Sequence, residues 1–155
     1  MAFFLSTFTN KIDKKGRVSV PSTFRTTVAA SGSAGIVLYK PMNLECLEGA
    51  DEAFLVQLSD KLYGDFGPFS PDQMSIATTI LGGAKQLGFD PEGRVVIPQD
   101  LCEFAGIKDK ATFVGIGRKF QIWDPDKFEM HREEQFKIAS EKAPGMQPFG
   151  GGGQV

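Results

Sequence analysis

Short apolar stretches alternate with helix-like segments along the chain, and the same order of segments occurs twice. Alternating and β-branched residues predict strands, whereas apolar residues at three- and four-residue spacing predict helices. In each half the order is strand, turn, strand, short helix, strand, turn, strand and longer helix. The segments include helices over 22–30, 51–62, 99–105 and 125–139, and strands over 36–39, 44–47, 112–115 and 120–123. This mixture predicts an α+β fold.

A nine-residue motif shows that this order reflects a sequence repeat. Residues 13–21 read DKKGRVSVP and residues 90–98 read DPEGRVVIP, at a constant offset of 77 positions. Aspartate, glycine, arginine, valine and proline recur at the same places. A repeat of this kind implies two equivalent structural units, usually packed about a pseudo-two-fold axis. Any surface built from the motif is then presented twice per chain.

The repeat also sets the expected domain boundaries. We expect a first repeat over 1–62, a linker with a connecting helix over 63–83, a second repeat over 84–142 and a disordered tail over 143–155. In the linker, Ser70 is a candidate N-cap in front of Pro71, and two glycines follow the predicted helix. The tail holds two prolines and a run of four glycines, with little to bury.

Charge is distributed unequally between the two motifs, although the net charge of the chain is only −2. Residues 10–25 hold five basic residues against one acidic residue, a net charge of +4. Residues 87–102 hold one basic residue against three acidic residues, a net charge of −2. The first loop is therefore a better candidate than the second for binding a polyanion.

The remaining composition indicates a protein of the reducing cytoplasm. No apolar run approaches the ~20 residues that span a bilayer, and we expect no signal peptide in the N-terminal segment MAFFL. The two cysteines, Cys46 and Cys102, lie in apolar surroundings. We therefore do not expect a disulfide between them.

The sequence offers no catalytic centre. Its single histidine, His131, falls on a charged helix, and no Cys/His cluster has zinc-ligand spacing. Gly115 and Gly117 resemble the start of a dinucleotide loop, but Phe120 stands where the third glycine is needed. Several carboxylates fall at predicted helix starts, where the helix dipole favours them: Asp51, Glu52, Asp72 and Asp126. We predict no enzyme, no cofactor and no metal site.

The repeated aspartate and arginine have two interpretations. An aspartate at the first position of a turn accepts backbone N–H bonds and fixes the loop, and the glycine that follows supplies a positive φ. The aspartate–arginine pair is then a loop-stabilising ion pair. Alternatively, the aspartate aims the arginine at a phosphate or a base edge. Both readings stay open for the first motif, and the stabilising one is favoured in the second. The residues concerned are Asp13, Gly16 and Arg17, and Asp90, Gly93 and Arg94.

Together these segments resemble the MraZ family over nearly the whole chain except the tail. The resemblance rests on FTNKIDKKGRVSVP (8–21), DPEGRVVIP (90–98), FAGI (104–107) and GRKFQIWD (117–124). It implies tandem AbrB-like, swapped-hairpin units that form one small β-barrel with flanking helices. It also implies a ring-shaped homo-oligomer in the bacterial cytoplasm, associated with the nucleoid. Such a protein regulates transcription at the promoter of the division and cell-wall gene cluster and binds short direct repeats in double-stranded DNA.

In this family the Asp-x-x-x-Arg motif is implied to carry the DNA contact, which falls here on Arg17 and Arg94. We hypothesise that Lys14 and Lys15 contact phosphates and that Arg17 makes a bidentate contact with a guanine edge. In the second motif Pro91 and Glu92 replace the lysines, and a glutamate is repelled by phosphate.

Two further hypotheses accompany this one. The chain could instead be an AbrB-like protein-interaction module without specific DNA binding. Four phenylalanines outside the repeated core either anchor the core and loops or cover a subunit interface: Phe3, Phe4, Phe66 and Phe69.

Overall fold

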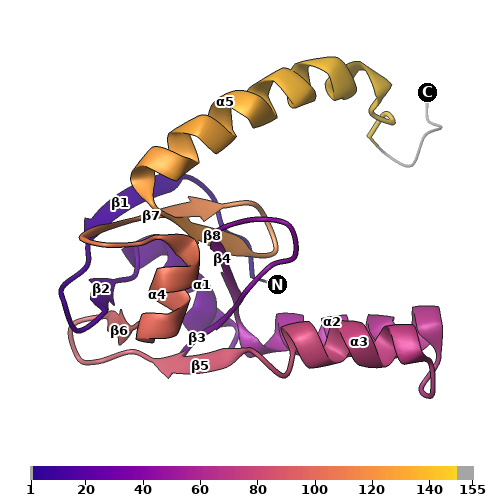
Figure 1. Cartoon of the computed structure of the whole chain (residues 1–155), viewed down its shortest axis with the longest axis horizontal. Helices are drawn as coiled ribbons and strands as arrows, with labels where there is room; N and C mark the ends of the chain where they lie inside the picture. The colour runs from indigo at the N-terminus through magenta and orange to yellow at the C-terminus, as the bar shows by residue number, and fades with distance from the viewer. Residues whose placement is uncertain (1, 150–155) are drawn as a thin grey trace. The chain divides into compact units, whose positions relative to one another are not determined.

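The computed structural model describes residues 2–149 and shows an α+β fold with antiparallel sheets and five α-helices among these residues. Figure 1 shows the arrangement of these elements. The strands are β1 (Thr7–Lys11), β2 (Arg17–Ser19), β3 (Gly35–Tyr39), β4 (Leu47–Ala50), β5 (Lys85–Gly88), β6 (Arg94–Val96), β7 (Lys110–Gly115) and β8 (Phe120–Trp123). The helices are α1 (Ser22–Ala30), α2 (Glu52–Phe66), α3 (Pro71–Ile80), α4 (Gln99–Ala105) and α5 (Pro125–Lys142), followed by the 3-10 turn η1 (Ala143–Gly145).

The strands form two sheets. Six strands pair in the order β1-β7-β8-β4-β3-β5, and β2 pairs with β6 in a separate two-stranded ribbon. All of these pairings are antiparallel. Since β1 and β5 form unpaired edges of the larger sheet, no closed barrel is found among residues 2–149.

The register of the ribbon follows the sequence repeat. Val18 pairs with Val95, its equivalent 77 positions further on, and Arg17 and Arg94 pair with Val96 and Ser19. The ladder between β4 and β8 is likewise centred on one pair, Glu48 with Gln121. The second and the fourth strands of one half therefore pair with their counterparts in the other half.

Aromatic side chains fill the core between the sheets and the short helices. The rings of Phe4 and Phe24 meet edge-on with centroids 5.2 Å apart, and Phe4 meets Phe120 at 5.0 Å. Such edge-to-face pairs stabilise a core beyond the area they bury. Phe4 is fully buried, so it anchors the core and is not available to a subunit interface.

Helices α2 and α3 form a hairpin at the end of the sheet opposite the ribbon (Figure 1). Asp51 caps α2 by accepting a hydrogen bond from the backbone N–H of Phe54. Ser70 caps α3, as predicted, and accepts from the N–H groups of Asp72 and Gln73. Helix α2 runs four residues beyond its predicted end at residue 62, into the segment expected to be a linker, and stops at Gly67 with φ 85°.

The fourth strand is the clearest error of the sequence-based assignment. It was predicted over 44–47 and is found at Leu47–Ala50. Glu48 and Gly49 are poor strand formers, but both are held here by tertiary contacts. A Cβ on Gly49 would lie 2.5 Å from the Phe120 ring, so the glycine leaves room for this ring in the core.

The chain divides into two compact units, residues 1–125 and 126–155. In the second unit, α5 carries Asp126 in its first turn and Lys142 in its last, an order that suits the helix dipole. The expected tail over 143–155 begins with the turn η1, and residues 150–155 lie outside the described part. The domain boundaries at 62, 83 and 142 stay a prediction. No helix in the described part is long and apolar enough to cross a membrane.

Candidate nucleic-acid interface

The first Asp-x-x-x-Arg loop is a tight turn organised by one carboxylate. Asp13 Oδ1 accepts the backbone N–H groups of Lys15 and Arg17, both at 2.9 Å. Its Oδ2 accepts Nε of Arg17 at 2.6 Å. Gly16 closes the turn with φ 89°, a conformation that favours glycine. The chain therefore enters β2 with the arginine side chain already oriented by the aspartate.

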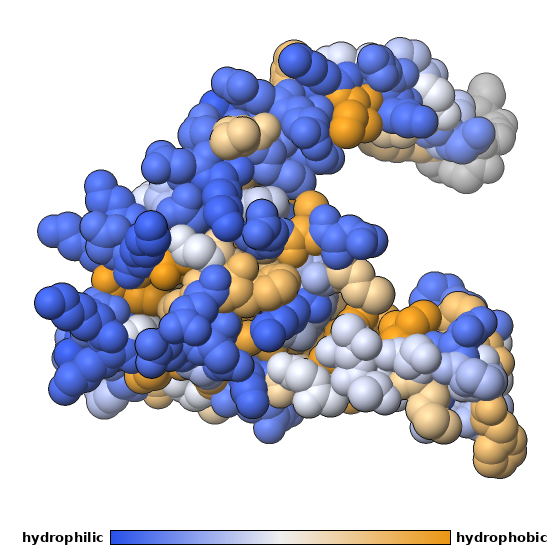
Figure 2. Space-filling model, viewed as in Figure 1, coloured by the Kyte–Doolittle hydropathy of each residue, from blue (hydrophilic) through white to orange (hydrophobic). Residues whose placement is uncertain are grey.

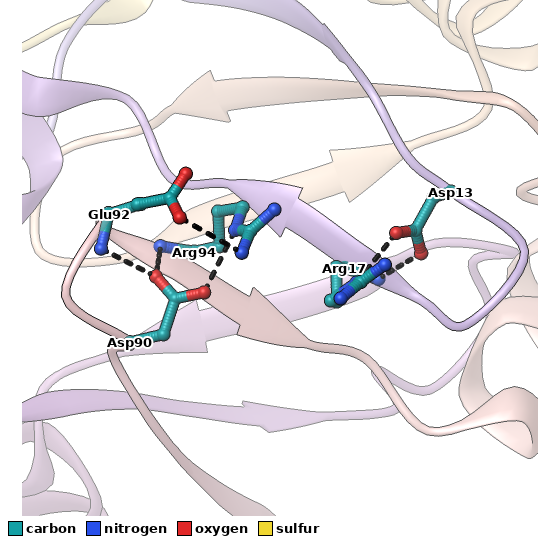
Figure 3. A network of polar contacts seen from close by, with 5 residues as sticks. All are labelled: Asp13, Arg17, Asp90, Glu92 and Arg94. Carbon is teal, nitrogen blue, oxygen red and sulfur yellow. Dashed lines mark hydrogen bonds and ion pairs between the residues drawn. The ribbon is translucent and has the colours of Figure 1, made fainter.

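The second loop repeats this arrangement bond for bond. Asp90 Oδ1 accepts the N–H groups of Glu92 and Arg94 at 2.9 Å, and Oδ2 accepts Nε of Arg94 at 2.8 Å. Gly93 has φ 78°. Figure 3 shows the two arginines on neighbouring strands, each beside its own aspartate.

These contacts keep both carboxylates charged. Hydrogen bonds from the backbone N–H and the side chain of Arg17 lower the pKa of Asp13 below its ordinary value. The backbone N–H of Arg94, then its side chain, lowers the pKa of Asp90 in the same way despite some desolvation. The loop-stabilising ion pair is thus present in both motifs. It does not exclude the aiming role, because an arginine bound through Nε still directs its Nη groups elsewhere.

The surroundings of the two arginines differ in charge. Within residues 2–149, the ion pair of Arg17 engages only Nε, and the neighbouring Lys14 and Lys15 are exposed. Arg94 has a second acidic neighbour, because Glu92 Oε1 lies 3.5 Å from its Nη2. The aspartates and Glu92 together raise the pKa of Arg94, with Asp90 contributing most. The first loop therefore presents an uncompensated basic tip, and the second does not.

The two loops rest on different side chains. Arg25, from α1, packs behind Gly93 and donates Nε to the carbonyl of Val20 at 3.1 Å. At the equivalent place behind the first loop, the thiol of Cys102 lies 3.9 Å from the carbonyl of Ile97. A hollow of about 500 Å³ opens beside the first loop, with Cys102 and Glu103 of α4 among its lining residues. Burial raises the pKa of the Cys102 thiol, which keeps it protonated near neutral pH.

The ribbon gathers both arginines on one face. In an antiparallel pair, partners share a face and successive residues alternate between faces. Val18 and Val95 point inward and are 1% exposed. The outward positions are Arg17, Ser19, Arg94 and Val96, all at least partly exposed. The major groove of B-DNA admits a two-stranded β-ribbon.

Three residues in or beside the ribbon were not predicted from the sequence to belong to the site: Asn10, Ser19 and Val96. Asn10 of β1 donates Nδ2 to the carbonyl of Ser19 at 2.8 Å and so ties the ribbon to the larger sheet. Ser19 and Val96 lie beside the arginines on the outward face. Their signal in the sequence was the alternation of the two strands, with a buried valine between outward residues.

A buried polar network lies away from the ribbon. Glu48 accepts hydrogen bonds from Tyr39 at 3.0 Å, Lys119 at 2.8 Å and Gln121 at 3.0 Å. Desolvation, then the charge of Glu48, raises the pKa of Cys46 to about 12. Each polar partner is satisfied, so the network fits a structural role. The described residues contain no cluster of three or more potential metal ligands, and both cysteines are free thiols.

Sheet, ribbon and loops define an α+β protein built on two copies of one loop motif. The comparisons with known proteins give this class a name: the chain belongs to the MraZ family. The family model described as "MraZ protein, putative antitoxin-like" matches residues 80–145. The resemblance seen in the sequence is therefore confirmed.

The relatives match over most of their length. The transcriptional regulator MraZ of Parvibaculum lavamentivorans is 37% identical over 166 residues, covering 99% of this chain and 100% of the relative. That of Beijerinckia indica is 40% identical over 131 residues, 84% of this chain and 79% of the relative. The transcriptional regulator MraZ of Rickettsia akari is 38% identical over 142 residues, which cover 92% of this chain and 95% of the relative. These relatives are transcriptional regulators and not enzymes, in agreement with the prediction from the sequence.

Proposed function

We propose that this chain is a sequence-specific DNA-binding transcriptional regulator that docks the β2–β6 ribbon against the major groove. One observation carries the proposal: two arginines stand on one outward face, and each is oriented by its own aspartate. Arg17 and Arg94 are diagonal neighbours in the ladder, a spacing of roughly 7–8 Å between Cα atoms in an ordinary antiparallel pair. Both can reach base edges from one docking position. The regulator names of the relatives support this use of the face.

The loop residues have two roles: some position the protein on the duplex, and others read the base sequence. Lys14 and Lys15 stand exposed at the loop tip and bind phosphates, which fixes the ribbon on the duplex without reading its sequence. Arg17 has a fork of donors that matches the N7 and O6 acceptors of guanine. Arg94 makes the same contact more weakly, because Glu92 competes for its Nη2 group.

The target is the promoter of the division and cell-wall gene cluster, with short direct repeats as boxes. The two sequence repeats of the chain fold as tandem AbrB-like, swapped-hairpin units about a pseudo-two-fold axis. The central pairs Val18–Val95 and Glu48–Gln121 support this arrangement, since equivalent strands meet there. The protein acts in the cytoplasm on the nucleoid.

A ring of identical chains would raise affinity by presenting several ribbons at fixed spacing. The α2–α3 hairpin supports self-association, because its apolar side chains are unusually exposed for a monomer. Phe66 is 43% exposed and Phe69 is 92% exposed. Figure 2 shows pale and orange surface along this hairpin.

A second candidate function is a protein-interaction module without specific DNA binding. The same exposed hairpin favours it, and so does the antitoxin-like description of the family model. In that case the basic loop would be a solvated turn, and binding to DNA would be weak and indifferent to sequence.

The test compares a labelled duplex from upstream of the protein's own gene with a scrambled duplex of the same composition, at several salt concentrations. The regulator predicts tight binding to the native duplex, weaker binding to the scrambled one, and strong weakening by salt on both. Equal affinity for the two duplexes would contradict the proposal and favour the interaction module.

A further inference from the structure

The outward face of the ribbon is symmetric in its arginines but not in the residues between them. Ser19 and Val96 are equivalent by the 77-residue repeat. Each lies two positions after an arginine and directly across the ladder from the other arginine. The pseudo-two-fold axis through Val18 and Val95 therefore exchanges a hydroxyl with an isopropyl group.

Val96 is an apolar side chain on a face that is otherwise polar. It is 53% exposed, and its neighbour across the ladder is Arg17, which has a side-chain exposure of 41%. Folding does not require a valine here, because Val95 on the opposite face supplies the packing and is 1% exposed. The branched side chain is thus free to contact whatever the two arginines bind.

The major groove offers one apolar feature to such a side chain, the C5-methyl group of thymine. Directly opposed residues of an antiparallel pair have Cβ atoms about 4.5–5.5 Å apart, so an arginine that reads a guanine brings its cross-strand neighbour close to an adjacent base. Ser19, at the equivalent place beside Arg94, can donate or accept a hydrogen bond but has little apolar surface. The two ends of the ribbon therefore suit different bases.

We propose that Val96 is a specificity-determining residue that contacts a thymine methyl group in the box, whereas Ser19 does not. The inference rests on the proposed DNA-binding function. Together with the basic tip at Lys14 and Lys15 and the acidic Glu92 at the other loop, this difference gives the ribbon a polarity on DNA. A ribbon with two different ends suits direct repeats, which all point the same way, better than it suits a palindrome.

The experiment replaces each thymine of the native duplex in turn by deoxyuridine, which removes only the C5-methyl group. Wild-type protein is expected to lose about fourfold in affinity at one or two thymines, the value of one buried methyl group. Val96→Ser is expected to bind the unmodified duplex several-fold more weakly and to be insensitive to deoxyuridine at those same thymines. Circular-dichroism melting checks that the variants fold.

Two control variants sharpen the result. Val56→Ser removes an exposed valine on α2, 61% exposed, and is expected to leave the deoxyuridine profile unchanged. Ser19→Val is expected to keep the original sensitive thymine and to add a new one. The inference is overturned if no thymine is sensitive in the wild type, or if Val96→Ser keeps the wild-type profile. Failure to prefer the native over the scrambled duplex would instead overturn the proposed function, and the inference with it.

Discussion

Val18 pairs with Val95 at the centre of the β2–β6 ladder, and the two residues occupy the same position of the sequence repeat. Both are buried, so the pair fixes the register while its neighbours face outward. A shift by one residue would turn the valines to solvent and the arginines into the core. This pair therefore explains why Arg17 and Arg94 are held on one face.

Gly16 and Gly93 have the same turn conformation but different neighbours, which predicts unequal effects of alanine. A Cβ on Gly16 would lie 2.3 Å from the backbone carbonyl of Ile97, whereas a Cβ on Gly93 would meet the flexible side chain of Arg25 at 2.7 Å. We expect Gly93→Ala to lower the free energy of unfolding by about 1–2 kcal/mol, the cost of a left-handed residue. Gly16→Ala should cost about 1–3 kcal/mol more because backbone must move. Urea unfolding measures both, and equal losses would contradict the account of the two loops.

Glu92→Lys places a lysine where the first motif has Lys15. The change removes the acid that lies 3.5 Å from Arg94 and adds a cation beside the DNA. We expect tighter DNA binding and a salt dependence steeper by about one unit. Asp60→Lys, at an exposed position of α2 in the hairpin at the end of the sheet opposite the ribbon (Figure 1), makes the same change of net charge and should leave the slope unaltered. A similar gain in both variants would mean that only net charge matters.

Stability should depend on pH through Asp13 and Asp90. The pKa of each carboxylate is lowered in the folded protein, chiefly by backbone N–H bonds. A lowered pKa stabilises the fold above the ordinary value near 3.8, and this stabilisation is lost as pH falls through the folded pKa. We expect wild type to be more stable at pH 7 than the double variant Asp13→Asn/Asp90→Asn. The difference in the free energy of unfolding should shrink below about pH 4. Urea titrations from pH 7 to pH 3 test this, and a constant difference would argue against it.

Asp51 joins a helix cap to a buried ion pair. It is 1% exposed, accepts from Phe54, and lies 3.0 Å from Nη1 of Arg118. Burial raises its pKa, but hydrogen bonds from Arg118, Ser31 and the backbone of Phe54 outweigh this and lower it. Removing one partner of such a pair costs about 3–5 kcal/mol.

Asp51→Ala should therefore destabilise the protein by about 3–4 kcal/mol, and Asp51→Asn by less, because asparagine keeps the cap. Asp72→Ala, at an exposed first turn of α3, is the control and should cost under about 1 kcal/mol. Thermal melts and urea unfolding compare the three variants. A cost for Asp51→Ala no larger than that of the control would contradict the assigned ion pair.

Local signals in the sequence were sufficient for the short helices and the loops. The predicted helices over 22–30 and 99–105 are confirmed, and Ser70 caps α3 as expected. The fourth strand was misplaced because its stability comes from cross-strand packing of Gly49 on Phe120 and from the Glu48 network, which no local pattern encodes. The second strand of each half is found as predicted, in β2 and β6, but the pairing of these two strands in a separate ribbon was not predicted, because it joins residues 77 positions apart.

The role of Arg17 in reading DNA is tested by measuring the affinity of wild type and two Arg17 variants for the native and scrambled duplexes at one fixed salt concentration. We expect Arg17→Ala to lose at least about tenfold in affinity for the native duplex, as expected for one bidentate base contact, and much less for the scrambled one. Arg17→Lys should keep the charge but not recover the selectivity. Unchanged selectivity in Arg17→Ala would contradict the proposal that this arginine, oriented by Asp13, reads the DNA.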